Sequence, residues 1–97
     1  MTGNSSAILK GSIRGVGSWF RSPIGVSAAG PALRAALGPG WRGTVVTVKG
    51  PAGEADTVLS DWMRRDRLID LDDDVFVAVC GALSRGVCHV IVERMEP

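Results

Sequence analysis

Residues 70–92, DLDDDVFVAVCGALSRGVCHVIV, hold the densest run of start and stop signals in the chain. The acids that open this stretch, and the arginine and glycine that follow its apolar run, are typical of the two ends of a helix. They predict a helix over about residues 73–85. Because valine and phenylalanine favour strands, a strand over 74–80 followed by a short turn is the alternative. The β-branched run Val87–Val92 predicts a strand that is covered on both sides.

Further elements precede this stretch. The run Thr44–Val48 lies between glycines and predicts a strand. From Ala55 to Met63, apolar residues recur at positions i, i+3, i+4, i+7 and i+8, which predicts an amphipathic helix. The segment Pro31–Leu37 predicts a short helix, because proline is tolerated in a first turn and a glycine follows the segment.

The beginning of the chain is rich in glycine, with eleven of the thirteen glycines in residues 1–53. Its apolar residues show a helical spacing at Leu9, Ile13, Val16 and Phe20. Glycines interrupt that spacing, so we favour a strand over residues 7–14, which would be the third strand of a sheet. The elements together predict an α+β fold, a small sheet of about three strands covered on one side by two or three helices. Residues 26–97 would form this domain, after a glycine-rich basic segment 1–25 whose order the sequence leaves open.

Charge is segregated along the chain. Residues 1–53 carry six basic residues and no acid, for a charge of +6, whereas residues 54–97 carry ten acids and five basic residues, for −5. Such asymmetry indicates a charged partner, or one half that neutralises the other. The 45% hydrophobic content argues against disorder, and no apolar run reaches the roughly 18 residues that a transmembrane helix needs.

The sequence shows no motif for catalysis or for a cofactor. The acids at the start of residues 70–92 lack the glycine and the final glutamate of a calcium loop, and a capped helix start explains them. Cys80, Cys88 and His89 are too few for a zinc site. Cys88 and His89 are neighbours on the expected strand and would point to opposite faces, so they would not meet as a nucleophile and its base. We therefore expect no enzyme, no metal and no cofactor. The cysteines are expected to be reduced in a cytoplasmic protein, with organellar import as the alternative because the beginning of the chain lacks acids.

These observations favour a non-enzymatic protein-interaction or regulatory module that self-associates as a homo-oligomer. Its partner-binding residues would be Trp62, Arg64 and Arg65, although Trp62 could instead belong to the core. The alternative is a small RNA- or DNA-binding protein that uses the basic, acid-free first half. The nucleic-acid-binding residues would then be Lys10, Arg14, Trp19, Arg21, Arg42 and Lys49.

Overall fold

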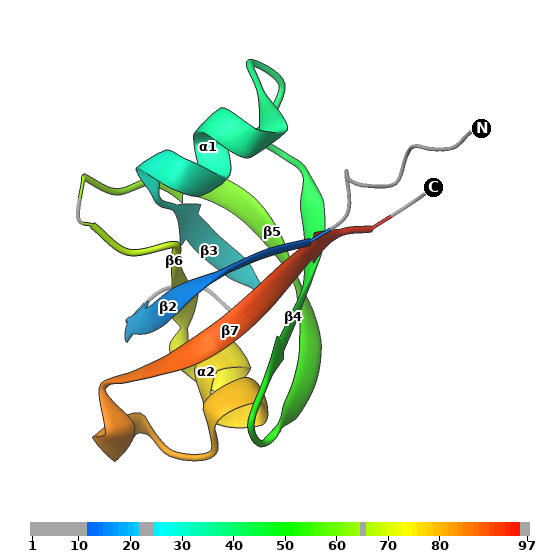
Figure 1. Ribbon diagram of the computed structural model, residues 1–97. Helices are drawn as coiled ribbons and strands as arrows, with labels where there is room; N and C mark the ends of the chain where they lie inside the picture. The colour runs from blue at the N-terminus through cyan, green and yellow to red at the C-terminus, as the bar shows by residue number, and fades with distance from the viewer. Residues whose placement is uncertain (1–11, 22–24, 65, 96–97) are drawn as a thin grey trace.

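The computed structural model describes residues 12–21, 25–64 and 66–95 of the chain. Six strands close into a barrel in the order β2-β6-β3-β5-β4-β7, with β7 returning to β2 (Figure 1). The strands are β2 (Ser12–Phe20), β3 (Val26–Ala29), β4 (Val45–Gly50), β5 (Gly53–Trp62), β6 (Ile69–Asp72) and β7 (Val87–Arg94). The pairs β2·β6 and β3·β5 are parallel, and the other neighbours are antiparallel.

The predicted three-stranded sheet under helices is therefore wrong. The main error lies at residues 55–63, for which a helix was predicted. Residues 55–62 lie in strand β5, and residue 63 follows its end. Thr57 and Leu59 are buried, while Val58 between them is 36% exposed, so burial follows a period of two and not the helical spacing. Pairing with β3 on one side and β4 on the other decides the conformation of this segment.

Other predicted elements are confirmed. Strands β4 and β7 lie where the β-branched runs predicted them, and helix α1 spans Pro31–Leu37. Helix α2 begins at Asp73 but ends at Cys80, because Gly81 turns the chain with a φ of 103° and the short 3-10 helix η1 (Leu83–Arg85) follows. The strand alternative for residues 74–80 is wrong.

The first part of the chain joins the barrel. Residues 12–20, which the sequence groups with a segment 1–25, form β2 and pair with β6 and β7. Strand β2 therefore includes residues 12–14 of the predicted strand 7–14. Residues 7–11 lie outside the described residues. The helical spacing that ends at Phe20 does not correspond to a helix over residues 12–20.

The core fills the barrel interior and both of its ends. The two helices lie toward opposite ends of the barrel in Figure 1. Helix α1 contributes buried Leu33, and α2 contributes Phe76 and Val79, which are fully buried. The inward residues of the strands are mainly valine and leucine, as a narrow closed barrel requires: Val46, Val48, Leu59, Ile69, Leu71, Val90 and Val92.

Gly30 allows α1 to lie close to the connection between β5 and β6. The N–H of Gly30 donates a hydrogen bond to the carbonyl oxygen of Leu68 at 2.9 Å. A Cβ atom at this position would lie 1.8 Å from the carbonyl oxygen of Arg67, so only glycine fits. This approach holds the start of α1 at the barrel end where β5 finishes.

A disulfide joins Cys80, at the end of α2, to Cys88 in β7. The expectation of reduced thiols is therefore wrong. The bond closes the segment that contains η1 and fixes α2 to the strand that completes the barrel.

Candidate functional site

A row of short and acidic side chains crosses the outer surface of four strands. In the strand registers, Ala28 of β3 lies between Asp61 of β5 and Asp70 of β6, and Asp70 lies opposite Ser18 of β2. Side chains at paired positions share a face. Because Ile69 and Leu71 point into the core, the row Asp61, Ala28, Asp70 and Ser18, hereafter the acidic row, lies on the side of the strands turned away from the core. Ala28 and Ser18 are each 4% exposed, so Asp61 and Asp70 are the members of the row that reach solvent.

The carboxylate of Asp70 in the acidic row is held by a hydrogen bond from a neighbouring strand. The hydroxyl of Ser18 donates a hydrogen bond to Oδ1 of Asp70 at 2.8 Å, and Ser18 itself is only 4% exposed. Within the described residues, Oδ2 of Asp70 accepts no hydrogen bond, and the side chain is half-buried. A buried serine thus fixes the carboxylate while one oxygen stays available to a ligand donor.

Trp62 follows Asp61 at the end of β5 and pairs in register with Ala29, so it points to the other side of the strand from the acidic row. Its ring is 45% exposed, so the interpretation of Trp62 as a core residue is wrong. The guanidinium carbon of Arg34 lies 5.5 Å from the ring centroid, and that of Arg64 lies 5.6 Å away. Arg34 is itself held by hydrogen bonds from Nη1 to the carbonyl oxygens of Ala29 (2.8 Å) and Met63 (2.9 Å). These contacts orient the ring and leave a large part of it open to solvent.

Asp72, two residues beyond Asp70 on β6, connects the elements around the acidic row through hydrogen bonds. It is fully buried, and its Oδ1 accepts a hydrogen bond from the N–H of Val75 at 2.7 Å as the N-cap of α2. Its Oδ2 accepts from the N–H of Gly25, just before β3. Asp72 therefore joins α2 to β3, and the predicted capping role of the acidic cluster is confirmed for this residue. The described residues contain no group of three or more metal-ligating side chains.

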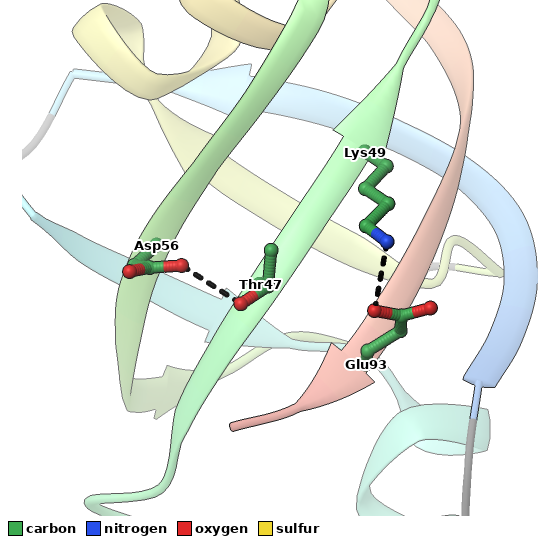
Figure 2. Close-up of polar contacts among 4 residues, drawn as sticks. All are labelled: Thr47, Lys49, Asp56 and Glu93. Atoms are coloured by element: carbon green, nitrogen blue, oxygen red, sulfur yellow. Dashed lines mark hydrogen bonds and ion pairs between the residues drawn. The ribbon is translucent and has the colours of Figure 1, made fainter. Parts of the chain in front are cut away.

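A second polar surface lies on the outer face of β4, β5 and β7 (Figure 2). Nζ of Lys49 lies 3.1 Å from Oε1 of Glu93, and the hydroxyl of Thr47 donates to Oδ1 of Asp56 at 2.8 Å. The hydrogen bond and the charge of Glu93 raise the pKa of Lys49 above its ordinary value. Lys49 borders a cavity of about 400 Å³ that Arg14 and His89 also line.

The other predicted nucleic-acid-binding residues do not gather with these. Nε1 of Trp19 donates to the carbonyl oxygen of Leu83 at 3.1 Å, and the Trp19 ring packs near Phe76 of the core. Arg42 lies over the ring of Trp41 at 4.7 Å. Arg21 is exposed at the end of β2, and Lys10 lies outside the described residues.

Arg42 borders a separate cavity of about 470 Å³, between the turn before β4 and the end of β7. Arg94 and exposed Met95 complete its wall. The guanidinium of Arg42 donates to the carbonyl oxygen of Ser60, so this cation is already bound to the barrel. Among the described first-half cations, Arg14 and Lys49 thus share one cavity and the others lie on separate surfaces.

The closed barrel of parallel and antiparallel strands belongs to the same fold class as an expansin. No protein-family model and no curated protein matches the chain. Two solved structures of the expansin of Clavibacter michiganensis match, each with a TM-score of 0.73: a mutant in complex with cellohexaose, at 16% identity, and the apo protein, at 17%. Each match covers 89% of this chain and 52% of the expansin chain, so this chain spans about half the length of the expansin. At such identities the likeness shows a shared fold.

This finding corrects the functional hypotheses. The predicted intracellular, self-associating protein-interaction or regulatory module is wrong, and so is the nucleic-acid-binding alternative. The first relied on an amphipathic helix over residues that form strand β5, and the second on one basic half, of whose described cations Arg14 and Lys49 share a cavity while the others lie elsewhere. That Trp62, Arg64 and Arg65 bind a partner stays a prediction. The structure places Trp62 and Arg64 together, and Arg65 lies outside the described residues. No helix of the described chain has the length and apolar character to cross a membrane.

Sequence reasoning missed Asp70 and Ser18 as a pair. The alternation of Ile69, Asp70, Leu71 and Asp72 is the period of a half-buried strand, and it was the available signal for β6. No local pattern links these residues to Ser18, which is 52 positions away.

Proposed function

We propose that this chain is a carbohydrate-binding domain that holds a neutral polysaccharide on the acidic row and against Trp62 at the end of β5. The observation that carries the proposal is the Asp70 carboxylate, which buried Ser18 orients and whose Oδ2 accepts no hydrogen bond from the described residues. Sugar hydroxyls are donors, and a carboxylate is a strong acceptor for them. The likeness to an expansin whose structure holds cellohexaose supports this choice of ligand.

A sugar site also needs an apolar surface for the ring of the sugar, and Trp62 supplies one. A pyranose ring has an apolar face of C–H groups, and an aromatic ring of fixed orientation offers a matching apolar surface. Arg34 and Arg64 hold the Trp62 ring in place, so little side-chain entropy is lost when a sugar binds. Asp61 belongs to the same row, and one of its oxygens accepts from the N–H of Trp62 at 2.8 Å.

We also propose that the domain binds without hydrolysing its ligand. Hydrolysis of a glycosidic bond ordinarily uses two carboxyl groups, one of which keeps a proton that it gives to the leaving oxygen. Asp72 is the fully buried carboxylate of the described residues, and both of its oxygens accept backbone hydrogen bonds, so it acts as a structural cap. Release of reducing sugar from the polysaccharide by the pure protein would overturn this part of the proposal.

The disulfide supports a location in an oxidising compartment, where a polysaccharide-binding domain meets its ligand outside the cytoplasm. Expression with and without export, followed by a count of free thiols, tests this location. Protein that keeps free thiols and full stability after export would contradict it.

Isothermal titration with cellohexaose tests the binding site. We expect the Trp62→Ala variant to lose about tenfold in affinity, equivalent to the contact energy of one aromatic platform. The Asp70→Asn variant should lose roughly fivefold, because an amide replaces the charged acceptor.

Asp74→Asn is the matched control, because Asp74 is an exposed acid on α2 that lies off the acidic row. It should bind as the wild type does. Wild-type protein that fails to bind cellohexaose, or an Asp70→Asn variant that binds as tightly as the control, would overturn the proposal.

A further inference from the structure

The cavity of about 400 Å³ on the side of β4, β7 and β2 gathers basic side chains from strands that are distant in the sequence. Arg14 of β2 pairs in register with Ile91 of β7, and Ile91 pairs with Lys49 of β4. His89 lies two residues from Ile91 on the same strand and therefore faces the same way. The barrel thus places Arg14, His89 and Lys49 around one apolar residue.

Two of these three groups have unused hydrogen-bond donors. Arg14 and His89 are exposed and make no hydrogen bond or ion pair with any residue that the structure describes. Lys49 is paired with Glu93, as Figure 2 shows, and this acid raises the pKa of the lysine. Of these three groups, Arg14 is consequently the permanent cation that has no acidic partner among the described residues.

A second cavity, of about 270 Å³, continues from the first. Both are lined by Arg14 and Gly15, and the second reaches Arg67 and Asp66 near the start of α1. Arg14 therefore stands between two adjoining hollows. Such a path suits an extended chain better than a single small ion.

The charges along this path are mixed. Lys49, Arg14 and Arg67 supply positive charge, whereas Glu93 and Asp66 interrupt them. A polymer with dense negative charge would meet these acids at close range. A polymer that carries its carboxylates at intervals can place one against Arg14 and keep hydroxyl groups near the acids.

We propose that these adjoining cavities, hereafter the basic path, form a second site that binds a carboxylate-bearing polysaccharide, with the guanidinium of Arg14 as the main contact. A guanidinium donates two parallel hydrogen bonds to a carboxylate, and His89 can donate a further one. Ile91 supplies the apolar wall against which a sugar ring packs. This inference deepens the proposed function, because it names an acidic glycan as a second ligand of the same domain.

The test titrates the full chain with a galacturonic acid oligosaccharide at low salt. We expect the Arg14→Glu variant to bind about tenfold more weakly than the wild type, the loss of a charge-assisted contact. The His89→Ala variant should lose roughly threefold. Arg85→Glu is the matched control for net charge, because Arg85 is exposed on η1 and lines neither cavity.

Three results would overturn the inference. Equal losses for Arg14→Glu and Arg85→Glu would show that only net charge matters. Equal affinity for the fully methyl-esterified oligosaccharide would show that the carboxylates make no contact. Equal affinity for a polyglutamate of similar length would show an anion site that does not select a glycan.

Failure of the basic path to bind an acidic oligosaccharide is distinguishable from failure of the proposed cellohexaose site. Binding of cellohexaose, which has no carboxylate, depends on Trp62 and Asp70 and should be unchanged in Arg14→Glu. If cellohexaose binds and the acidic oligosaccharide does not, the basic path alone is refuted.

Discussion

The acidic row and the basic path use opposite means to present polar groups from one barrel. In the acidic row, short side chains and a buried serine hold Asp70 in one orientation. In the basic path, long side chains project from antiparallel strands, and Arg14 has no partner among the described residues. The first surface is rigid before a ligand arrives, and the second must order its side chains on binding. We therefore expect the first to select ligand shape and the second to depend on charge.

Asp72→Ala should have the largest effect, because this residue supports the rigid surface. The change removes the N-cap of α2 and leaves the buried N–H groups of Val75 and Gly25 without acceptors. We expect a loss of about 3 kcal/mol in the free energy of unfolding, measured with urea. Asp74→Ala, the exposed neighbour, should change it by less than about 0.5 kcal/mol. Equal stability of the two variants would show that Asp72 does not support this surface.

Reduction of the disulfide should weaken the basic path more than the acidic row. Cys88 is adjacent to His89 on β7, whereas the acidic row lies on other strands. Closing so short a segment is worth about 2–3 kcal/mol, so reductant should lower the stability by that amount. A Cys80→Ala and Cys88→Ala double variant should show no further response to reductant. A wild type that is indifferent to reductant would contradict the disulfide.

Ser18→Ala sharpens the claim that the acidic row is rigid. Asp70 would keep its charge and lose the hydroxyl that orients Oδ1. We expect about a threefold loss of cellohexaose affinity at unchanged affinity for the acidic oligosaccharide. Titration calorimetry with both ligands measures the split. A variant with full cellohexaose affinity would show that the serine does not orient the carboxylate for binding.

Glu93→Gln should have the smallest effect and act on the basic path alone. The change releases Lys49 and lets its pKa fall toward the ordinary value near 10.5. Lysine remains charged at neutral pH, so binding of the acidic oligosaccharide should strengthen by about twofold.

The same variant should unfold as the wild type does at neutral pH, because exposed ion pairs contribute little. The raised pKa of Lys49 means that the stabilisation by Glu93 is present below the unfolded pKa and is lost as the pH rises through the folded value. Any small difference in stability between the variant and the wild type should therefore be present at neutral pH and vanish at strongly alkaline pH. Weaker binding of the acidic oligosaccharide would contradict the role given to Lys49.

Local patterns sufficed where a segment's own residues decide its structure. The β-branched runs of β4 and β7 and the proline and glycine around α1 predict those elements correctly. They failed at β5, because Ala55, Val58, Leu59 and Trp62 fit a helical spacing until pairing with two neighbours imposes the other period. Barrel closure joins β2 to β7 across most of the chain, and no local signal encodes that pairing.

The candidate site was predicted less completely than the fold. The sequence leaves two interpretations of Trp62, as a partner contact or as a core residue. It identifies Arg14 and Lys49 as cations but does not indicate that they line the same cavity. Asp70 was assigned to a helix start because three further acids follow within four residues. Its pairing with Ser18, and the bond between Cys80 and Cys88, depend on contacts that only the folded chain makes.

A backbone amide NMR titration of the isotope-labelled chain with cellohexaose tests the central claim most directly. The account predicts that the largest shifts fall on Ser18, Asp61, Asp70 and the indole N–H of Trp62, with Arg14 and His89 unmoved. Shifts that cluster on β4 and β7, or no shifts at a large excess of the oligosaccharide, would contradict it.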